Sequence, residues 1–209
     1  PPFRDSKQIG YCGVTERLEG VDPEEAAPEI SFMTKVFSWF VITRAPFLTA
    51  IIVPILIGAA WVAYSGLSPR FPWGLFALAL FAGIFMHIAA NTFNDYFDWR
   101  SGTDKANNDY FMPYSGGSRS IELGLISEKA LFRVAIVSLV IASGLGLALT
   151  IISGPWVLAI GVFGSLSSYF YTAPPLRLAA RRGLGELLIG LNFGPLVTAG
   201  TVYALTGSM

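Results

Sequence analysis

Charged residues are scarce in this 209-residue chain. Lysine and arginine together number 14, aspartate and glutamate also number 14, and the four types make up 13% of the sequence. Soluble domains carry about 25%. The formal net charge is zero and no basic tract is present, so nothing in the composition indicates a nucleic-acid partner. A single cysteine, Cys12, excludes a disulfide or a cysteine metal cage within this sequence.

Apolar residues are abundant instead. They make up 53% of the chain, and the mean hydropathy is +0.57, which indicates an integral membrane protein. The first residues contain no positively charged segment followed by an apolar core, so no signal peptide is predicted. Because the sequence opens on Pro-Pro rather than on methionine, we expect translation to start upstream of Pro1.

The first part of the chain is polar. Residues 1–35 include an acidic run broken by prolines, which predicts an extramembrane N-terminal extension, either a mobile tail or a segment that docks on a partner. Residues 31–43 then place apolar side chains at helical spacing. This pattern predicts an amphipathic helix at the membrane interface.

Five apolar stretches follow, each close to the roughly 20 residues that a helix needs to cross a bilayer. They lie at 47–64, 73–93, 131–152, 156–173 and 184–206. The sequence therefore predicts an all-α fold, a polytopic bundle of transmembrane helices. Lysine and arginine gather in alternate connections, with only Arg70 on the other side, and this asymmetry predicts that the basic side faces the cytoplasm of a bacterial cell.

A cluster of polar and acidic side chains ends the second apolar stretch, on the basic side. If the helix continues through it, Asn91, Asn94, Asp95 and Asp98 share one face. Like charges at these spacings repel one another unless a cation lies between them. Oxygen ligands of this kind suit magnesium, which proteins usually hold through one or two carboxylates and a substrate's phosphates. The alternative is a solvated helix end.

Two connections on the same side carry arginines that could contact a phosphate. In residues 113–120, glycines would let backbone amides approach an anion beside Arg119, although an ordinary turn is the alternative. In residues 169–186, Arg177 would clamp a phosphate, or would serve as a membrane anchor. Glu186 begins the last apolar stretch and is expected to meet an arginine or to cap its helix.

These motifs, in this order, resemble those of the UbiA superfamily of intramembrane aromatic prenyltransferases. The likeness covers about residues 36–205, within a membrane domain at 36–209, and is strongest to the 1,4-dihydroxy-2-naphthoate prenyltransferases of menaquinone synthesis. It rests on Arg44-Ala-Pro46, Asn94-Asp95-Tyr-Phe-Asp98, Ser-Gly-Gly-x-Arg119, Tyr171-Thr-Ala-Pro-Pro-Leu-Arg177, Gly-Leu-Gly-Glu186 and Phe193-Gly-Pro-Leu.

The resemblance implies magnesium-dependent transfer of a polyprenyl group from polyprenyl diphosphate to an aromatic acceptor. The implied metal ligands are Asn94, Asp95, Asp98 and Asp104, the last as the nearest substitute for an aspartate that the family places where this chain has Gly102. The expected substrate contacts are Arg44, Asn91, Arg119 and Arg177. The expected catalytic residues are Asp95, Asp98 and Tyr171, with Tyr171 beside the reacting allyl carbon.

Other aromatic residues have expected roles in the same chemistry. The side chains expected to stabilise an allylic cation are those of Tyr96, Phe97, Tyr169 and Tyr171. His87 lies one helical turn before Asn91 and would either contact the acceptor ring or serve as an interhelical hydrogen-bond partner.

The chain departs from the family pattern in one respect. Family members resemble bundles of nine membrane helices with a second acidic motif, and no second Asp-x-x-x-Asp follows Tyr171 here. Two hypotheses follow. The chain is the N-terminal portion of a menaquinone-pathway prenyltransferase, or it is a non-catalytic membrane subunit on the same scaffold, within a larger respiratory or photosynthetic complex and in contact with quinone or pigment.

Overall fold

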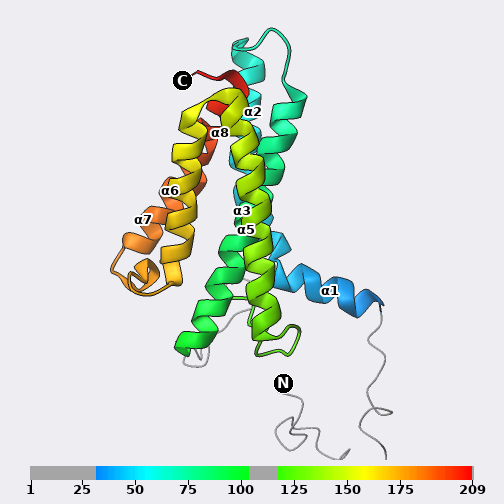
Figure 1. Ribbon diagram of the computed structural model, residues 1–209, viewed down its shortest axis with the longest axis vertical. Helices are drawn as coiled ribbons and strands as arrows, with labels where there is room; N and C mark the ends of the chain where they lie inside the picture. The colour runs from blue at the N-terminus through cyan, green and yellow to red at the C-terminus, as the bar shows by residue number, and fades with distance from the viewer. Residues whose placement is uncertain (1–31, 104–116, 209) are drawn as a thin grey trace, which may run out of the picture.

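The computed structural model describes residues 32–103 and 117–208, which form a bundle of helices (Figure 1). The helices are α1 (Phe32–Ile42), α2 (Thr49–Ser65), α3 (Trp73–Ser101), α5 (Glu128–Ser153), α6 (Pro155–Thr172), α7 (Leu184–Leu191) and α8 (Val197–Thr206). Short 3-10 helices occupy Ala45–Leu48 and Leu178–Ala180. No strand occurs in these ranges, and the predicted all-α class is confirmed.

Four helical segments are long and apolar enough to cross a membrane. They are Ala45–Ser65, Trp73–Ser101, Glu128–Ser153 and Leu184–Thr206, and they confirm four of the five predicted stretches. The other stretch forms α6, which is 18 residues long but is not one of these four. Its second half carries three serine and two tyrosine residues.

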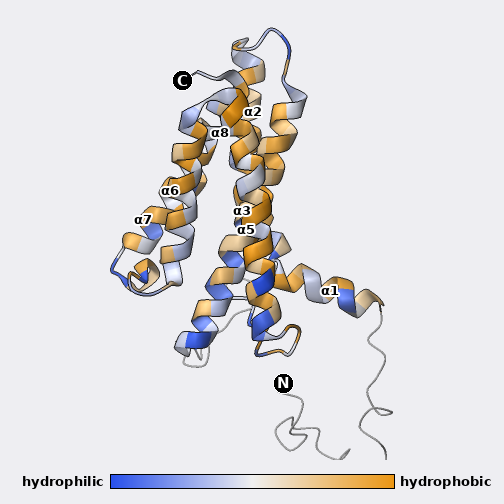
Figure 2. Cartoon of the chain, in the orientation of Figure 1, coloured by the Kyte–Doolittle hydropathy of each residue, from blue (hydrophilic) through white to orange (hydrophobic). Residues whose placement is uncertain are grey.

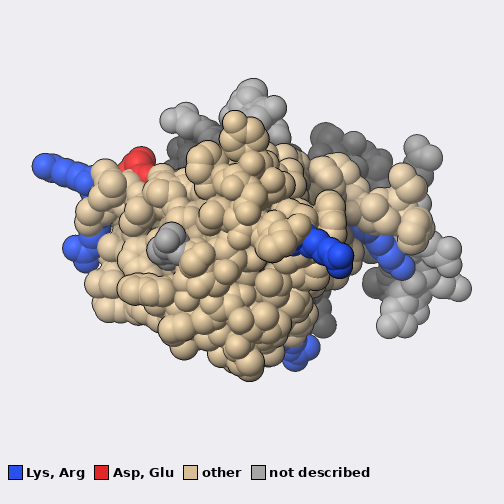
Figure 3. Space-filling view, turned by 90° about the horizontal axis from the view of Figure 1, so that it is seen from above, with Lys and Arg blue, Asp and Glu red and all other residues tan. Residues whose placement is uncertain are grey.

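The polar residues gather at one end of the bundle. Figure 2 shows apolar residues along the middle and polar ones where α3 ends and α5 begins. The opposite end shows few charged side chains across its face (Figure 3). Helix α1 runs crosswise to the bundle near the polar end (Figure 1), and its exposed side chains include Phe32, Phe37, Trp39 and Phe40. The helix predicted at 31–43 is confirmed, and its place at the membrane interface stays a prediction.

Small residues let α2 pack closely against α8. A Cβ atom on Gly58 would lie 2.7 Å from the carbonyl oxygen of Thr198 and 2.9 Å from Cβ of Thr201. Real Cβ contacts are not this short, so only glycine allows this approach between the two backbones. Near the end of the same contact, Val62 and Leu205 are buried together.

A π-helical turn over Asn192–Leu196 joins α7 to α8, so that Leu184–Thr206 is one helical segment. Pro195 lies inside this turn. Proline has no backbone N–H, and its ring crowds the carbonyl four residues earlier, so an unbroken α-helix is unfavourable there. Such widened turns re-aim side chains and occur frequently at functional sites.

Candidate active site

Arg44 joins three polar side chains of α3. Its Nη1 donates to Oδ1 of Asn91 at 3.2 Å, and its Nη2 donates to Oδ1 of Asn94 at 2.9 Å and to Oδ1 of Asp95. The three acceptors lie at i, i+3 and i+4, the spacing that places side chains on one face of a helix. The acidic motif of α3 was expected to surround a cation, and in this structure the Arg44 guanidinium occupies that place.

Asp95 is held from a second side by the loop before α5. The backbone N–H of Ser118 donates to Oδ1 at 3.2 Å, and the Ser118 hydroxyl donates to Oδ2. Asp95 is only 2% exposed, so these bonds and the Arg44 pair compensate a charge that would otherwise be costly to bury. Sequence reasoning missed Ser118, and its only signal was the adjoining Gly-Gly pair.

Asp98 lies one turn further along α3 and is partly buried. Its carboxylate interacts with the side chain of Asn94 and lies within electrostatic reach of Asp95, Arg44 and Arg177. Arg177 itself is exposed, and its Nη2 donates to Oγ1 of Thr103 at 3.3 Å, which ties the connection after α6 to the end of α3.

All three arginines proposed from the sequence share an unusual backbone. Arg44, Arg119 and Arg177 have φ values of 49°, 48° and 43°, and they are the only non-glycine residues with positive φ in the described ranges. This region costs an ordinary residue about 1–3 kcal/mol, and such residues cluster at functional sites. Arg119 also forms an ion pair with Glu122, with Nη1 and Oε2 3.5 Å apart.

A cavity of about 570 Å³ begins beside this polar cluster and extends between the helices. Arg44, Asn91, Asn94 and Tyr171 line its polar end. Along α3 the lining residues follow one helical face: Ala79, Ala82, Gly83, Met86, His87, Ala90, Asn91 and Asn94. From Ala79 to Asn94 this wall is roughly 22 Å long at the rise of an α-helix. Most of the remaining lining is apolar.

Tyr171 is the one residue of the four expected aromatics that lines the cavity. It lies within electrostatic reach of Glu186, Asp98 and Arg44. A Cβ atom on Gly185 would lie 3.3 Å from Cε2 of Tyr171, so a glycine at the start of α7 leaves room for the ring. Glu186 lies in the first turn of α7, where a carboxylate complements the helix dipole.

The other three aromatics do not line the cavity, and their expected role in stabilising an allylic cation stays a prediction. They belong to a separate cluster between α3, α5 and α6, in which the Phe97 ring lies 5.5 Å from that of Tyr169 and the Tyr96 ring 4.9 Å from that of Phe132. Apolar packing between helices, and not the cavity, determines where these rings point.

His87 is 5% exposed and packs between helices, edge-on to Phe193 at a centroid distance of 5.5 Å. Neither ring nitrogen has a hydrogen-bond partner among the residues that the structure describes. The expected interhelical hydrogen bond is therefore not seen there, although His87 does contribute to the cavity wall.

The oxygen ligands at the polar end of the cavity fit magnesium. A carboxylate has about four lone-pair sites, and the bonds from Arg44 and Ser118 leave one site on Oδ2 of Asp95 open. Asp98 and Asn94 supply further oxygens. No group of three or more acidic, histidine or cysteine side chains that could hold a metal occurs in the described ranges, so phosphate oxygens would have to complete the set. Asp104 lies outside the described residues.

In this helical membrane protein, Arg44 lies at the polar end of a long and mostly apolar cavity, an arrangement suited to an amphipathic ligand with an anionic head. The UbiA prenyltransferase family model matches residues 51–209, and the chain belongs to this family.

Its relatives include enzymes named for naphthoate and naphthoquinone substrates. The 1,4-dihydroxy-2-naphthoate octaprenyltransferases of Bacillus subtilis and Mycobacterium tuberculosis are each 30% identical, over 81% and 82% of this chain and 51% and 55% of their own length. The 2-carboxy-1,4-naphthoquinone phytyltransferase of Synechocystis is 29% identical over 81% of this chain and 52% of its own. The chain thus spans about half the length of these relatives. No solved structure matches it.

Proposed function

We propose that this chain is part of an enzyme that transfers a polyprenyl group from polyprenyl diphosphate to 1,4-dihydroxy-2-naphthoate in menaquinone synthesis. The observation that carries the proposal is the junction of the Arg44, Asn91, Asn94 and Asp95 cluster with a long apolar cavity. The names of the related enzymes support the choice of acceptor.

The donor would lie along α3, with its diphosphate at the polar end and its hydrocarbon tail toward Ala79. Arginine recognises phosphate oxygens through two parallel hydrogen bonds, so Arg44, Arg119 and Arg177 are the proposed diphosphate contacts. The apolar lining excludes water, which would otherwise capture the allylic cation that forms when the carbon–oxygen bond breaks.

Magnesium is proposed at Asn94, Asp95 and Asp98, with Asp104 as a candidate beyond the described residues. When bound, it would supply positive charge that stabilises the departing diphosphate. The aromatic face of Tyr171 at the cavity wall would stabilise the allylic carbon as positive charge develops. The electron-rich ring of the acceptor would then form the new carbon–carbon bond and lose a proton.

The polar end is proposed to face the cytoplasm. The basic connections at that end support this orientation by the positive-inside rule, in the cell membrane of a bacterium. Both substrates would then reach the mouth of the cavity from the inner leaflet and the cytoplasm. Cysteine labelling of full-length protein in intact cells would test it: a cysteine in place of Lys129 should be protected from an impermeant reagent, and one in place of Arg70 should react.

The central experiment is prenyl transfer by the full-length protein in lipid, with dihydroxynaphthoate offered beside 4-hydroxybenzoate. We expect product from the naphthoate, none after chelation of magnesium, and recovery when magnesium is restored. Asp98→Ala should lower kcat by at least about 100-fold, since transition-state charge stabilisation is of this size. Unchanged activity of Asp95→Ala and Asp98→Ala would remove the metal assignment, and transfer to hydroxybenzoate alone would remove the proposed acceptor.

A further inference from the structure

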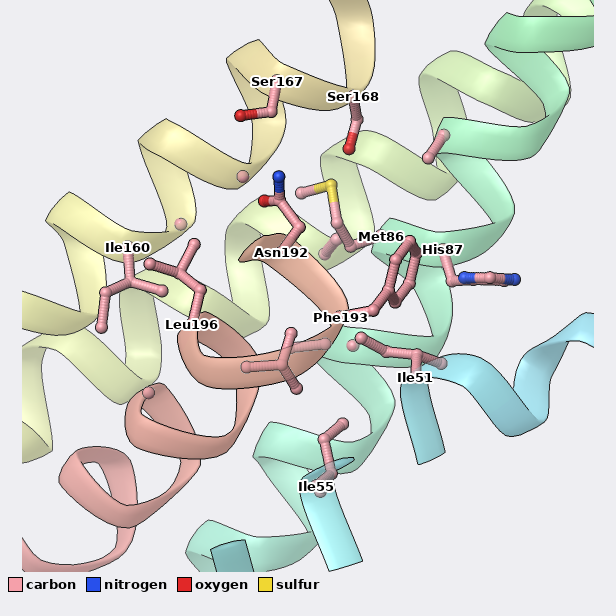
Figure 4. Close-up of a pocket in the computed structure, with 18 of the residues that line it drawn as sticks. Ile51, Ile55, Met86, His87, Ile160, Ser167, Ser168, Asn192, Phe193 and Leu196 are labelled. Carbon is pink, nitrogen blue, oxygen red and sulfur yellow. The ribbon is translucent and has the colours of Figure 1, made fainter. Parts of the chain in front are cut away.

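Ser168 behaves differently from the other serines in the second half of α6. Ser165 and Ser167 donate to backbone carbonyls four residues earlier, those of Gly161 and Phe163, each at 2.7 Å. Such bonds satisfy a hydroxyl within its own helix. Ser168 makes no hydrogen bond to the residues that the structure describes, and it lines the cavity. Figure 4 shows its hydroxyl directed toward Met86 and Asn192.

Asn192 faces Ser168 from the other side of the cavity. It is the first residue of the π-helical turn, and its Nδ2 donates to the Leu188 carbonyl at 2.8 Å. Its Oδ1 has no donor within the described ranges and points toward α6, where a Cβ atom on Gly164 would lie 3.7 Å away. Figure 4 shows the amide beside the end of the Met86 side chain.

The two polar groups therefore face one space without satisfying each other. No hydrogen bond joins Ser168 to Asn192, although the two side chains come from facing helices. Both side chains are only partly buried, and neither polar atom is among the fully buried ones without a partner, so both stay open to a ligand in the cavity. Pockets that bind small molecules commonly place a few polar groups in this way among apolar ones, because those groups orient the ligand.

The position of the pair along the cavity indicates which part of a ligand it would meet. Ser168 precedes Tyr171 by three residues on α6, so it lies roughly 4.5 Å deeper in the cavity. The polar mouth with Arg44 lies on one side of this level, and the apolar lining continues on the other. Phe193, next to Asn192, also lines the cavity, with its ring against His87.

We infer that Asn192 and Ser168 recognise a ring hydroxyl of the aromatic acceptor, an inference that rests on the proposed function. Asn192 Oδ1 accepts the hydroxyl proton, while the Ser168 hydroxyl donates to the same ring oxygen. Phe193 lies against the ring. This arrangement selects hydroxylated aromatics, because a ring without the hydroxyl leaves both polar groups unpaired.

The test measures equilibrium binding to the full-length protein in lipid, so that it does not depend on turnover. The probes are 1,4-dihydroxy-2-naphthoate and 2-naphthoate, which lacks the two hydroxyls. Ser168→Ala and Asn192→Leu should each weaken binding of the dihydroxy compound about 5- to 10-fold, the size of one hydrogen bond. Binding of 2-naphthoate should stay within about twofold of wild type, since it makes neither bond.

One control variant keeps this comparison specific. Thr150→Val removes a hydroxyl that donates to Gly146 within α5 and does not line the cavity, so it should change neither affinity. Asn192→Leu also removes the bond to Leu188 and would lower stability, whereas Ser168→Ala breaks no bond to the described residues. If Ser168→Ala leaves both affinities unchanged, or weakens both equally, the inference is overturned.

The same data separate this inference from the proposed function. Should wild-type protein transfer a prenyl group while the variants bind the dihydroxy compound normally, the recognition of the hydroxyl fails and the enzyme assignment stands. Should the variants lose affinity as expected while wild-type protein transfers nothing, the recognition stands and the enzyme assignment fails.

Discussion

Arg44 reaches three polar side chains of α3 from a backbone conformation that non-glycine residues seldom adopt. The sequence predicted the shared face of Asn91, Asn94 and Asp95 from helical spacing, and it predicted a cation among them unless they form a solvated helix end. It could not show that an arginine 51 positions from Asp95 provides that cation, because such contacts depend on how helices pack. In the same way, Ser118 could be located only once the loop had folded against Asp95.

The Arg44 and Asp95 pair should therefore contribute strongly to stability. Arg44→Ala leaves the Asp95 carboxylate, 2% exposed, without its cation, and loss of one partner of a buried pair costs about 3–5 kcal/mol. Arg100→Ala is the matched control, because Arg100 and Glu128 are 61% and 42% exposed and 3.6 Å apart. Its cost should stay below about 1 kcal/mol.

The measurement is the free energy of unfolding of full-length protein in mixed micelles, from denaturant titration followed by circular dichroism. A double-mutant cycle with Asp95→Ala isolates the coupling between the two side chains. Equal, small losses for Arg44→Ala and Arg100→Ala would contradict the assignment of Arg44 as the compensating charge.

At the scale of helices, apolar stretches predicted most of the observed elements. The second stretch was placed at 73–93, and α3 runs to Ser101 because the acidic motif continues the helix until Gly102 caps it with a φ of 76°. That conformation explains why glycine suits a position where the resemblance implied an aspartate. The π-helical turn was not predicted. Pro195 signals a disturbance, but the width of the turn, and hence the direction of Asn192, depends on packing against α6.

Close packing of α2 on α8 leads to a prediction for Gly58. Gly58→Ala places a methyl group 2.7 Å from the Thr198 carbonyl oxygen and should push the helices apart, at a cost of about 1–3 kcal/mol. Gly144→Ala on α5 is the control, since its Cβ would meet nothing within 4 Å and alanine favours a helix. The free energies of unfolding of the two variants, measured by denaturant titration, should shift in opposite directions or differ by more than about 1 kcal/mol. Equal stabilities would show that this contact is not tight.

At the scale of the whole molecule, the cavity is built by several helices, and no single segment of sequence predicts it. α2, α3, α5, α6 and the α7–α8 segment each contribute lining residues at helical spacing. The sequence identified the polar end because charged motifs are conspicuous in an apolar chain. The apolar end consists of alanine, glycine and aliphatic residues that look like those facing lipid or neighbouring helices, so only the assembled bundle distinguishes them.

The length of this cavity leads to a prediction about the donor. Ala79 lies roughly 22 Å from Asn94 along α3. If the prenyl tail lies along this wall, Ala79→Phe should block its far end. We expect at least about a tenfold lower kcat/KM with long-chain polyprenyl diphosphates, since an overpacked site costs about 1–3 kcal/mol. Geranyl diphosphate, which ends before this depth, should be used as by wild type. Ala77→Phe on the same helix does not line the cavity and serves as the control. A length-independent loss in Ala79→Phe, or the same length dependence in Ala77→Phe, would show that the tail takes another route.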